Sequence, residues 1–289
     1  MAALQYEAPD TLADAVRLLA KGNGVARVLA GGTDIVVQMQ MDVLEPALLV
    51  DIKKIPQLRT IQADKGSYRV GAAVTCMELM EHAAFCKTWP GVVDAVKLIG
   101  SIQVKGRATL GGNLCNASPA ADSVPALIAA GAQLEITGPK GTRQVPVADI
   151  LAGPGKTSLA RDEILGGFLF PRRPAHSGDA YQRITPRTEM DIAVVGVGVS
   201  LVLDDAGVCK AARVALGAVA PTALLVKEAA DALIGTRVDE AAVNRMAEAA
   251  SAACRPIDDK RATREYRVKT ASVLARRVAQ QALERARSN

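Results

Sequence analysis

Apolar positions in the first fifty residues follow two different periods. Leu12, Val16 and Leu19 share one helical face, and Asp10 or Thr11 precedes them as a candidate cap. The neighbouring segments are short apolar runs that read as strands, with a helix start between them: VARVLA (25–30), TDIVVQMQM (33–41) and ALLVDI (47–52). Strand, helix and strand in this order predict a small parallel α/β unit.

From about residue 60 the pattern changes to short alternating runs separated by turns and amphipathic segments. Four runs read as strands: YRVGAAV (68–74), AQLEIT (132–137), TRQVPV (142–147) and EILGGFLF (163–170). Three segments read as helices: TCMELMEHAAF (75–85), WPGVVDAVKLI (89–99) and DSVPALIAAG (122–131). This order predicts an α+β unit with a largely antiparallel sheet.

The segment PRRPAHSGD (171–179) is rich in proline, arginine and small residues and is the best candidate for a linker. Strand-like runs follow it at 180–186, 192–204 and 208–220, and then helices that start near Thr222, Asp239 and Ala262. We expect a domain at 1–175, with subdomains at about 1–58 and 59–175, and a second domain at 176–289. We interpret GVGVS within the second run as exposed and, with the basic helices, as a partner surface.

Composition places the chain among soluble globular proteins. It has 289 residues, 49% of them hydrophobic and 22% charged. The five cysteines form no C-x-x-C pair, no early segment resembles a signal peptide, and no apolar run is long enough to span a bilayer. A reduced, cytoplasmic location is expected.

The net charge of +5 raises the question of a nucleic-acid partner. The basic residues concentrate in 258–289, a segment of helical period in which acidic residues are interleaved with them. Aromatic residues make up only 3% of the chain. A solvated helix face explains the first observation, and the second leaves few platforms for stacking bases. We therefore expect no nucleic-acid partner.

Two glycine pairs each lie between apolar segments, in RVLAGGTDIVVQM (27–39) and RATLGGNLCNASPAAD (107–122). A glycine pair that opens a helix exposes backbone N–H groups that bind anions, and Thr33, Asn113 and Ser118 add neutral donors. Neither a P-loop nor a Rossmann fingerprint is present, and one glycine pair alone is usually a turn. Two pairs in matching settings favour a phosphate-binding role.

The remaining polar residues leave several interpretations open. Asp34 and Asp122 are each placed either to cap a helix or to bind a ribose hydroxyl. His82 and His176 are interpreted as surface residues, so no catalytic triad or metal site is expected. Cys115, inside the second motif, is interpreted as a filler rather than a redox group.

The motifs AGGTD and TLGGNLCNASPAAD and the C-terminal EYR resemble the FAD-binding medium subunit of molybdenum hydroxylases, of the xanthine dehydrogenase and carbon monoxide dehydrogenase type. The resemblance covers residues 4 to 285. It implies an α+β fold: a two-subdomain PCMH-type FAD-binding domain, then a C-terminal domain of a three-stranded antiparallel sheet and three helices. The chain departs from the family pattern at Gly106, where asparagine is frequent, and at Asn116, where threonine is common.

The resemblance also implies the residues that bind FAD. The diphosphate would lie between a first glycine loop, Leu29, Ala30, Gly31, Gly32, Thr33, Asp34 and Ile35, and a second, Thr109, Gly111, Gly112 and Asn113. Asn116, Ala121 and Asp122 would face the ribose and adenosine, and Leu165 and Arg183 the flavin. An inserted iron–sulfur cluster is not expected, because the chain has no cysteine cluster.

The implied function is that of an electron-transfer subunit in a heterotrimer that assembles as a dimer of heterotrimers. It would take electrons from [2Fe-2S] clusters on a small subunit and pass them to an external acceptor, while a large subunit carries molybdenum and its pterin. Two alternatives stay open: a free-standing FAD-dependent oxidoreductase, and a non-catalytic scaffold subunit.

Overall fold

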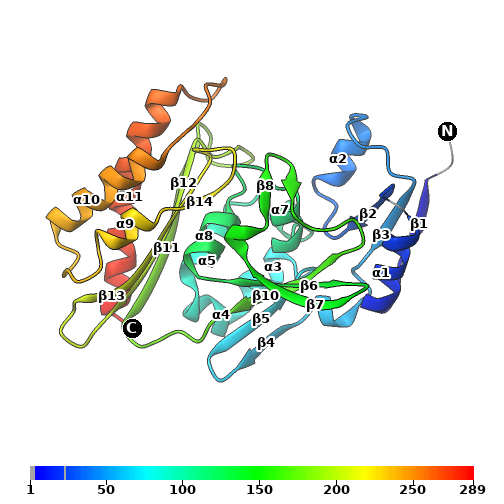
Figure 1. The fold of residues 1–289 in the computed structure, drawn as a ribbon, viewed down its shortest axis with the longest axis horizontal. Coiled ribbons are helices and arrows are strands. Elements are labelled where there is room, and N and C mark those ends of the chain that lie inside the picture. Colours follow the sequence, from blue (N-terminus) through cyan, green and yellow to red (C-terminus); the bar gives the residue numbers. More distant parts are fainter. Residues whose placement is uncertain (1–3, 23) are drawn as a thin grey trace.

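The structure is a computed structural model that describes residues 4–22 and 24–289. Three sheets follow one another along the molecule (Figure 1), and we name the parts built around them the N-terminal, central and C-terminal units. The N-terminal unit lies at one end, the central unit in the middle, and the C-terminal unit with its long last helix at the other end.

The N-terminal unit confirms the predicted parallel α/β arrangement. Its sheet has the order β1-β3-β2 with both pairs parallel. Its elements are β1 (Gln5–Glu7), α1 (Leu12–Lys21), β2 (Ala26–Leu29), α2 (Ile35–Gln40), β3 (Leu48–Asp51) and η1 (Pro56–Leu58). Thr11, rather than Asp10, caps α1, because its hydroxyl accepts the Asp14 amide at 3.1 Å. Strand β1 was not predicted, since it has three residues and all are exposed.

The central unit is built on an antiparallel sheet of order β4-β5-β10-β6-β7. Its strands are β4 (Ile61–Asp64), β5 (Ser67–Gly71), β6 (Gln133–Gly138), β7 (Gly141–Pro146) and β10 (Ile164–Phe170), and a hairpin joins β8 (Leu151–Gly153) to β9 (Lys156–Thr157). The predicted strands are present as β5, β6, β7 and β10. Strand β4 was not predicted, because it is an edge strand whose residues are mostly exposed and give no apolar alternation.

Helices cover this sheet and carry the second glycine pair. They are α3 (Cys76–Glu81), α4 (Ala83–Thr88), α5 (Pro90–Val96), α6 (Ile102–Lys105), α7 (Leu110–Cys115) and α8 (Ser123–Ala129), with a 3-10 turn η2 (Val147–Asp149). The single helix predicted over 75–85 is wrong, because it breaks at His82. The imidazole Nδ1 of His82 accepts the Phe85 amide at 3.1 Å and so caps a new helix.

The C-terminal unit has the three long strands expected, β11 (Ser177–Ile184), β12 (Val195–Leu203) and β13 (Cys209–Gly217). A two-residue strand, β14 (Leu224–Leu225), extends this antiparallel sheet at its edge beside β13. The three expected helices follow as α9 (Lys227–Asp231), α10 (Glu240–Ala253) and α11 (Arg264–Arg287).

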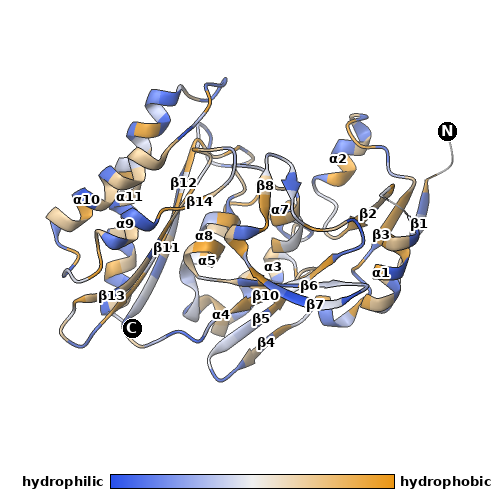
Figure 2. Cartoon of the chain, in the orientation of Figure 1, coloured by the Kyte–Doolittle hydropathy of each residue, from blue (hydrophilic) through white to orange (hydrophobic). Residues whose placement is uncertain are grey.

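Strand β12 is buried, so the interpretation of GVGVS as an exposed partner surface is wrong. Helix α11 packs on one face of this sheet and α8 of the central unit on the other. A Cβ on Gly198 would lie 2.7 Å from the Pro125 carbonyl oxygen in α8, so glycine is needed for this close approach. Figure 2 shows hydrophobic residues on β12 and on α5 and α8 beside it.

The predicted linker is an ordered joint between the central and C-terminal units. Arg173 and Asp179 form an ion pair of 2.6 Å, with side chains only 6% and 4% exposed. The Arg173 guanidinium lies 4.8 Å from the centre of the Trp89 ring, and Asp179 accepts the Gly91 amide at 2.9 Å. These contacts reach α5, so the segment fixes the position of the two units instead of separating them.

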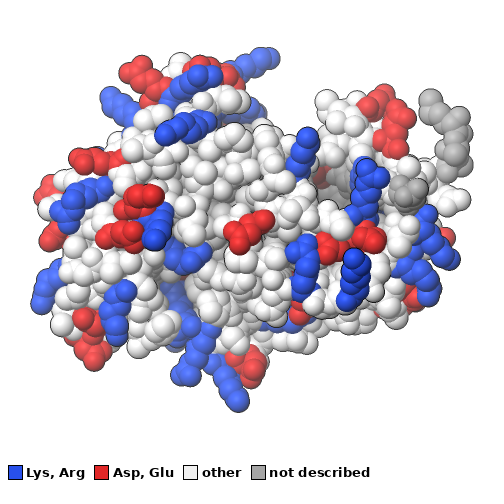
Figure 3. Space-filling model, viewed as in Figure 1, with Lys and Arg blue, Asp and Glu red and all other residues white. Residues whose placement is uncertain are grey.

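Charged side chains of both signs are interspersed over the C-terminal unit on the face in Figure 3. On α11, the long helix predicted to be basic, Arg267 is buried and bonds the Val194 carbonyl at 2.6 Å. Arg285 pairs with Asp94 of α5 at 2.6 Å. Part of the basic character therefore serves packing between elements.

Candidate functional site

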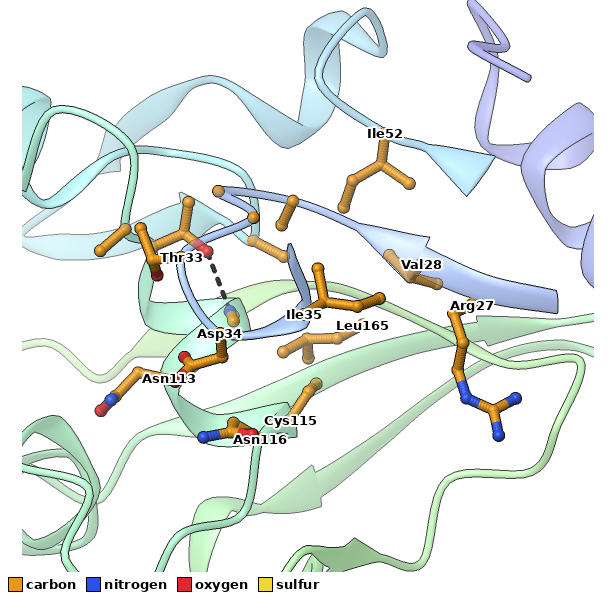
Figure 4. A pocket seen from close by; sticks show the side chains of 18 of the residues that line it. Arg27, Val28, Thr33, Asp34, Ile35, Ile52, Asn113, Cys115, Asn116 and Leu165 are labelled. Carbon is orange, nitrogen blue, oxygen red and sulfur yellow. Dashed lines mark hydrogen bonds between the residues drawn. The ribbon is translucent and has the colours of Figure 1, made fainter. Parts of the chain in front are cut away.

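A cavity of about 560 Å³ lies between the N-terminal and central units. This volume is within the range of roughly 300–1,000 Å³ that is typical of small-molecule and cofactor sites. Twelve of the sequence-predicted residues line it: Ala30, Gly31, Gly32, Thr33, Asp34, Ile35, Thr109, Gly111, Gly112, Asn113, Asn116 and Leu165. Figure 4 shows Thr33, Asp34, Asn113 and Asn116 gathered on one side and Arg27 and Val28 on the other. The two glycine pairs, about eighty residues apart in the chain, thus border one cavity.

The first glycine loop (Leu29–Ile35) follows β2 and lies directly against the segment that leads into the second. A Cβ on Gly31 would lie 2.1 Å from the carbonyl oxygen of Arg107, so only glycine fits there. Gly32 has a φ of +83°, in the left-handed region that glycine adopts without strain. Within the described chain, the amides of Gly31 and Gly32 have no hydrogen-bond acceptor. They are free donors at the edge of the cavity.

The second glycine loop (Thr109–Asn113) opens helix α7. The Thr109 hydroxyl caps this helix by accepting the Gly112 amide at 2.9 Å. A Cβ on Gly111 would lie 2.5 Å from the Ala72 carbonyl oxygen, whereas a Cβ on Gly112 would meet only the Thr109 hydroxyl, at 3.2 Å. Gly111 therefore allows close packing, and Gly112 keeps the cavity side of the loop open.

Polar side chains from three helices complete this side of the cavity. The side-chain oxygen of Asn113 accepts a hydrogen bond from the Ser123 hydroxyl of α8 at 2.6 Å. The NH₂ group of the Asn113 side chain is therefore the part left to donate. The Gln38 amide of α2 donates to the Asn116 side chain at 3.0 Å and bridges the two units. Desolvation by the surrounding protein raises the pKa of Asp34 above its usual value.

Four predicted residues do not line the cavity: Leu29, Ala121, Asp122 and Arg183. Leu29 is the last residue of β2, next to the first glycine loop, and Ala121 is buried. The interpretation of Asp122 as a helix cap is wrong, because its side chain makes no capping bond to α8. Its carboxylate instead accepts hydrogen bonds from Arg183 and from the Tyr181 hydroxyl, both on β11.

The Asp122–Arg183 pair is almost fully buried, with side chains 9% and 4% exposed. Burial raises the pKa of Asp122 to about 6, against the opposing effect of Arg183. Burial and the neighbouring Asp122 raise the pKa of Tyr181 well above its usual value. This cluster links the central unit to the C-terminal sheet.

Sequence reasoning missed several residues that line the cavity, among them Gln38 and Cys115. The helical period offered a signal for Gln38, because it lies three positions after Ile35 on the same helix. Cys115 lines the cavity with an exposed side chain, although desolvation by the surrounding protein raises the pKa of its thiol to about 12. Arg27, Glu163 and Gly155 also line the cavity, and no local pattern indicated them.

No group of three or more His, Cys, Asp or Glu side chains in 4–22 and 24–289 is arranged to hold a metal ion. None of the helices in this part of the chain combines the length and apolar character needed to cross a bilayer. His82 caps α4, and His176 lies 3.7 Å from Asp205 at the surface.

Comparison with known proteins gives matches along almost the whole chain. The family described as the FAD binding domain in molybdopterin dehydrogenase matches residues 2–173, and the CO dehydrogenase flavoprotein C-terminal domain matches residues 180–282. The xanthine dehydrogenase FAD-binding subunit of Escherichia coli O157:H7 is 34% identical over 280 residues, which cover 96% of this chain and 95% of the relative. The carbon monoxide dehydrogenase medium chain of Afipia carboxidovorans is 33% identical and covers 98% of each chain.

Solved structures agree with these matches. A chain of carbon monoxide dehydrogenase from Hydrogenophaga pseudoflava superimposes with a TM-score of 0.94 at 32% identity, with 98% of each chain covered. A chain of quinoline 2-oxidoreductase from Pseudomonas putida 86 gives a TM-score of 0.90 at 29% identity, again with 98% of each chain covered. The protein therefore belongs to the family of FAD-binding medium subunits of xanthine and carbon monoxide dehydrogenases, and it is an oxidoreductase subunit with FAD as its cofactor.

Proposed function

We propose that this chain is the FAD-carrying electron-transfer subunit of a heterotrimeric molybdenum-dependent dehydrogenase. In this role it takes electrons from [2Fe-2S] clusters of a small subunit and passes them to an external acceptor, while a large subunit holds molybdenum and its pterin. The observation that carries the proposal is one cavity bordered by two glycine loops from different units, the first of which has two free backbone amides. Similarity over 98% of the length of a carbon monoxide dehydrogenase medium chain supports it.

The residues present fit a dinucleotide. Free amides in the first glycine loop and the open space beside Gly112 suit a diphosphate, which needs close approach to bare backbone. Under this proposal Leu29–Ile35 and Thr109–Asn113 hold the diphosphate, and Asn116, Ala121 and Asp122 serve the ribose and adenosine side. Leu165, which lines the cavity, serves the flavin side, and so does Arg183, which lies outside the lining and pairs with Asp122.

Bound FAD supplies one- and two-electron redox chemistry, and the protein positions it and controls its surroundings. Of the described residues that line the cavity, only Arg27, Asp34 and Glu163 are charged. Glu163 is already paired with Arg143 at 2.7 Å, which leaves no base paired with a nucleophile in the cavity. A carrier of electrons needs no such group, whereas a free-standing oxidase that activates its own substrate does.

The domain boundaries and the assembly belong to the same proposal. A FAD-binding domain at 1–175, with subdomains at about 1–58 and 59–175, and a C-terminal domain at 176–289 are supported by the family matches to 2–173 and 180–282. We further propose a dimer of heterotrimers in the cytoplasm, with no nucleic-acid partner.

Purification of the protein from its native cells tests the proposal. We expect FAD, released by acid, together with iron and molybdenum in a constant ratio to this chain. Flavin without either metal would favour a free-standing oxidoreductase. A folded chain that holds no flavin and does not bind added FAD would contradict the proposal and favour a scaffold subunit.

A further inference from the structure

A diphosphate brings negative charge into the cavity, yet neither glycine loop contains a basic residue. Arg27 is the one cation among the described residues that line the cavity. Figure 4 shows its side chain away from Thr33, Asp34 and Asn113. Groups that orient the loop amides toward a bound anion therefore have to act from behind the loops. This inference rests on the proposed function.

Lys53 lies behind the first glycine loop. Its ammonium group donates to the carbonyl oxygen of Ala30 at 3.0 Å and pairs with the Asp51 carboxylate at 2.8 Å. Asp51 is itself buried and also accepts a hydrogen bond from the Tyr6 hydroxyl at 2.5 Å. Although burial opposes ionisation, the bonds from Lys53 and Tyr6 hold the pKa of Asp51 below its usual value. The ammonium is thus held in place by an ionised carboxylate.

The geometry of the peptide bond converts this contact into an effect on the cavity. In a trans peptide the C=O and the next N–H point to opposite sides of the chain. The Ala30 carbonyl faces Lys53, so the Gly31 N–H points away from Lys53. Arg107 repeats the arrangement one residue later, because its Nε lies 3.5 Å from the Gly31 carbonyl oxygen and the Gly32 N–H points the other way. Ala30, Gly31 and Gly32 all border the cavity, and the amides of Gly31 and Gly32 have no acceptor in the described chain.

We propose that Lys53 is a positioning residue for the anionic part of the cofactor. It fixes the Ala30–Gly31 peptide so that the Gly31 N–H is presented to the diphosphate, and it polarises that peptide without touching the ligand. Arg107 acts in the same way on the next peptide through its longer contact. The selectivity that results is for a flavin that carries a diphosphate over a flavin that carries none.

The test compares the Kd values of FAD and riboflavin for the chain, by quenching of flavin fluorescence after removal of bound flavin. We expect Lys53→Met to weaken FAD binding about tenfold, because the Gly31 N–H is then no longer held toward the diphosphate. One charge-assisted hydrogen bond of this kind corresponds to roughly tenfold or more in affinity. Riboflavin, which has no phosphate, should bind the variant as it binds the original chain. Lys53→Arg should restore most of the FAD affinity.

Lys54→Met is the matched control, because it removes the same charge at an exposed neighbour that makes no ion pair with any described residue. Equal losses for FAD and riboflavin, an equal loss in Lys54→Met, or unchanged FAD affinity in Lys53→Met would each overturn the positioning role. If Lys53→Met does not fold, Lys53→Gln, which keeps a neutral donor, should still favour riboflavin relative to the original chain. Failure of the unaltered chain to bind FAD would instead contradict the proposed function.

Discussion

At the scale of the residue, glycines that look alike in the sequence do different things. Gly31 and Gly111 lie against backbone carbonyls of other segments, where a Cβ would overlap an oxygen atom. Gly112 lines the cavity, where a Cβ would meet only the Thr109 hydroxyl, at 3.2 Å. The first kind allows close packing and the second leaves room in the cavity, so under the proposed function their substitutions should separate stability from cofactor binding.

We expect Gly112→Val to lose most bound FAD while the flavin-free chain keeps its melting temperature. The side chain fills the space that the diphosphate needs, and valine is no worse than glycine inside a helix. Gly111→Val should lower the melting temperature strongly, because its Cβ would lie 2.5 Å from the Ala72 carbonyl oxygen. Flavin content and thermal unfolding of both variants check this. Full flavin content in a folded Gly112→Val variant would refute the assignment of the second loop.

The buried Asp122 predicts a dependence of stability on pH. Its pKa of about 6 in the folded chain lies above the value of about 3.9 in an unfolded chain, so between these values the folded state holds a proton that the unfolded state releases. The contribution of Asp122 to the free energy of unfolding is fully present below pH about 4. It is lost, by about 3 kcal/mol, as the pH rises through about 6.

Asp122→Asn isolates this contribution, because other carboxylates change over the same range. The free energy of unfolding of the original chain, minus that of Asp122→Asn, should fall between pH 4 and 6 and stay level above. Arg183→Met should move the fall to higher pH, since Arg183 opposes the rise in the pKa of Asp122. A difference that does not vary with pH would show that Asp122 does not titrate in this window.

At the scale of the element, α2 stands out because none of its residues is buried. Val36, Val37 and Met41 are 44%, 48% and 68% exposed, and α2 projects from the molecule (Figure 1). Ile35 and Gln38 of this helix line the cavity. A side-chain hydrogen bond from Gln38 to Asn116 connects α2 to the central unit. Such a weakly packed element opens at little cost in free energy, so it is suited to admit and release a large cofactor.

Gln38→Ala should therefore speed the release of FAD by about three- to tenfold, as expected for the loss of one neutral hydrogen bond. The melting temperature of the flavin-free chain should not change, because α2 adds little to the core. Gln40→Ala, at an exposed position on the same helix, is the control. Release rates follow from the recovery of flavin fluorescence after dilution. If both variants release FAD at the original rate, the bridge has no role in retention.

At the scale of the whole molecule, buried ion pairs join the central and C-terminal units. Arg173–Asp179 and Asp122–Arg183 are both almost fully buried, and Arg285 pairs with Asp94 across the same boundary. Removal of one partner leaves a buried charge uncompensated, which typically costs about 3–5 kcal/mol. The two units should therefore unfold together while these pairs are intact.

We expect Arg173→Met to lower the free energy of unfolding by about 3–5 kcal/mol and to change the emission of Trp89. Trp89 is the only tryptophan of the chain and lies against the Arg173 guanidinium, so its fluorescence reports on this joint. Denaturant titration followed by fluorescence measures both quantities. Arg172→Met, an exposed neighbour, should leave them unchanged. An unaltered transition in Arg173→Met would mean that the joint does not couple the units.

Local signals in the sequence were enough for much of the fold. Apolar periodicity located most strands and helices, and the glycine pairs marked two loops that border one cavity, because side-chain burial and backbone freedom depend on a few neighbouring residues. The short strands β1, β4 and β14 were not predicted, because two to four mostly exposed residues are too few to show an alternation of apolar and polar positions. The burial of β12 was not predicted either, because the helices that cover it come from other parts of the chain.

The sequence by itself determined the class of fold, the order of its units and the two loops that border the cavity. Only the tertiary structure decided which glycines pack against distant backbone, that Asp122 pairs with Arg183, and that Lys53 lies behind Ala30. Each of these contacts joins residues more than twenty positions apart in the chain. Packing of whole elements brings such residues together, and no local pattern of hydrophobic and polar positions records it.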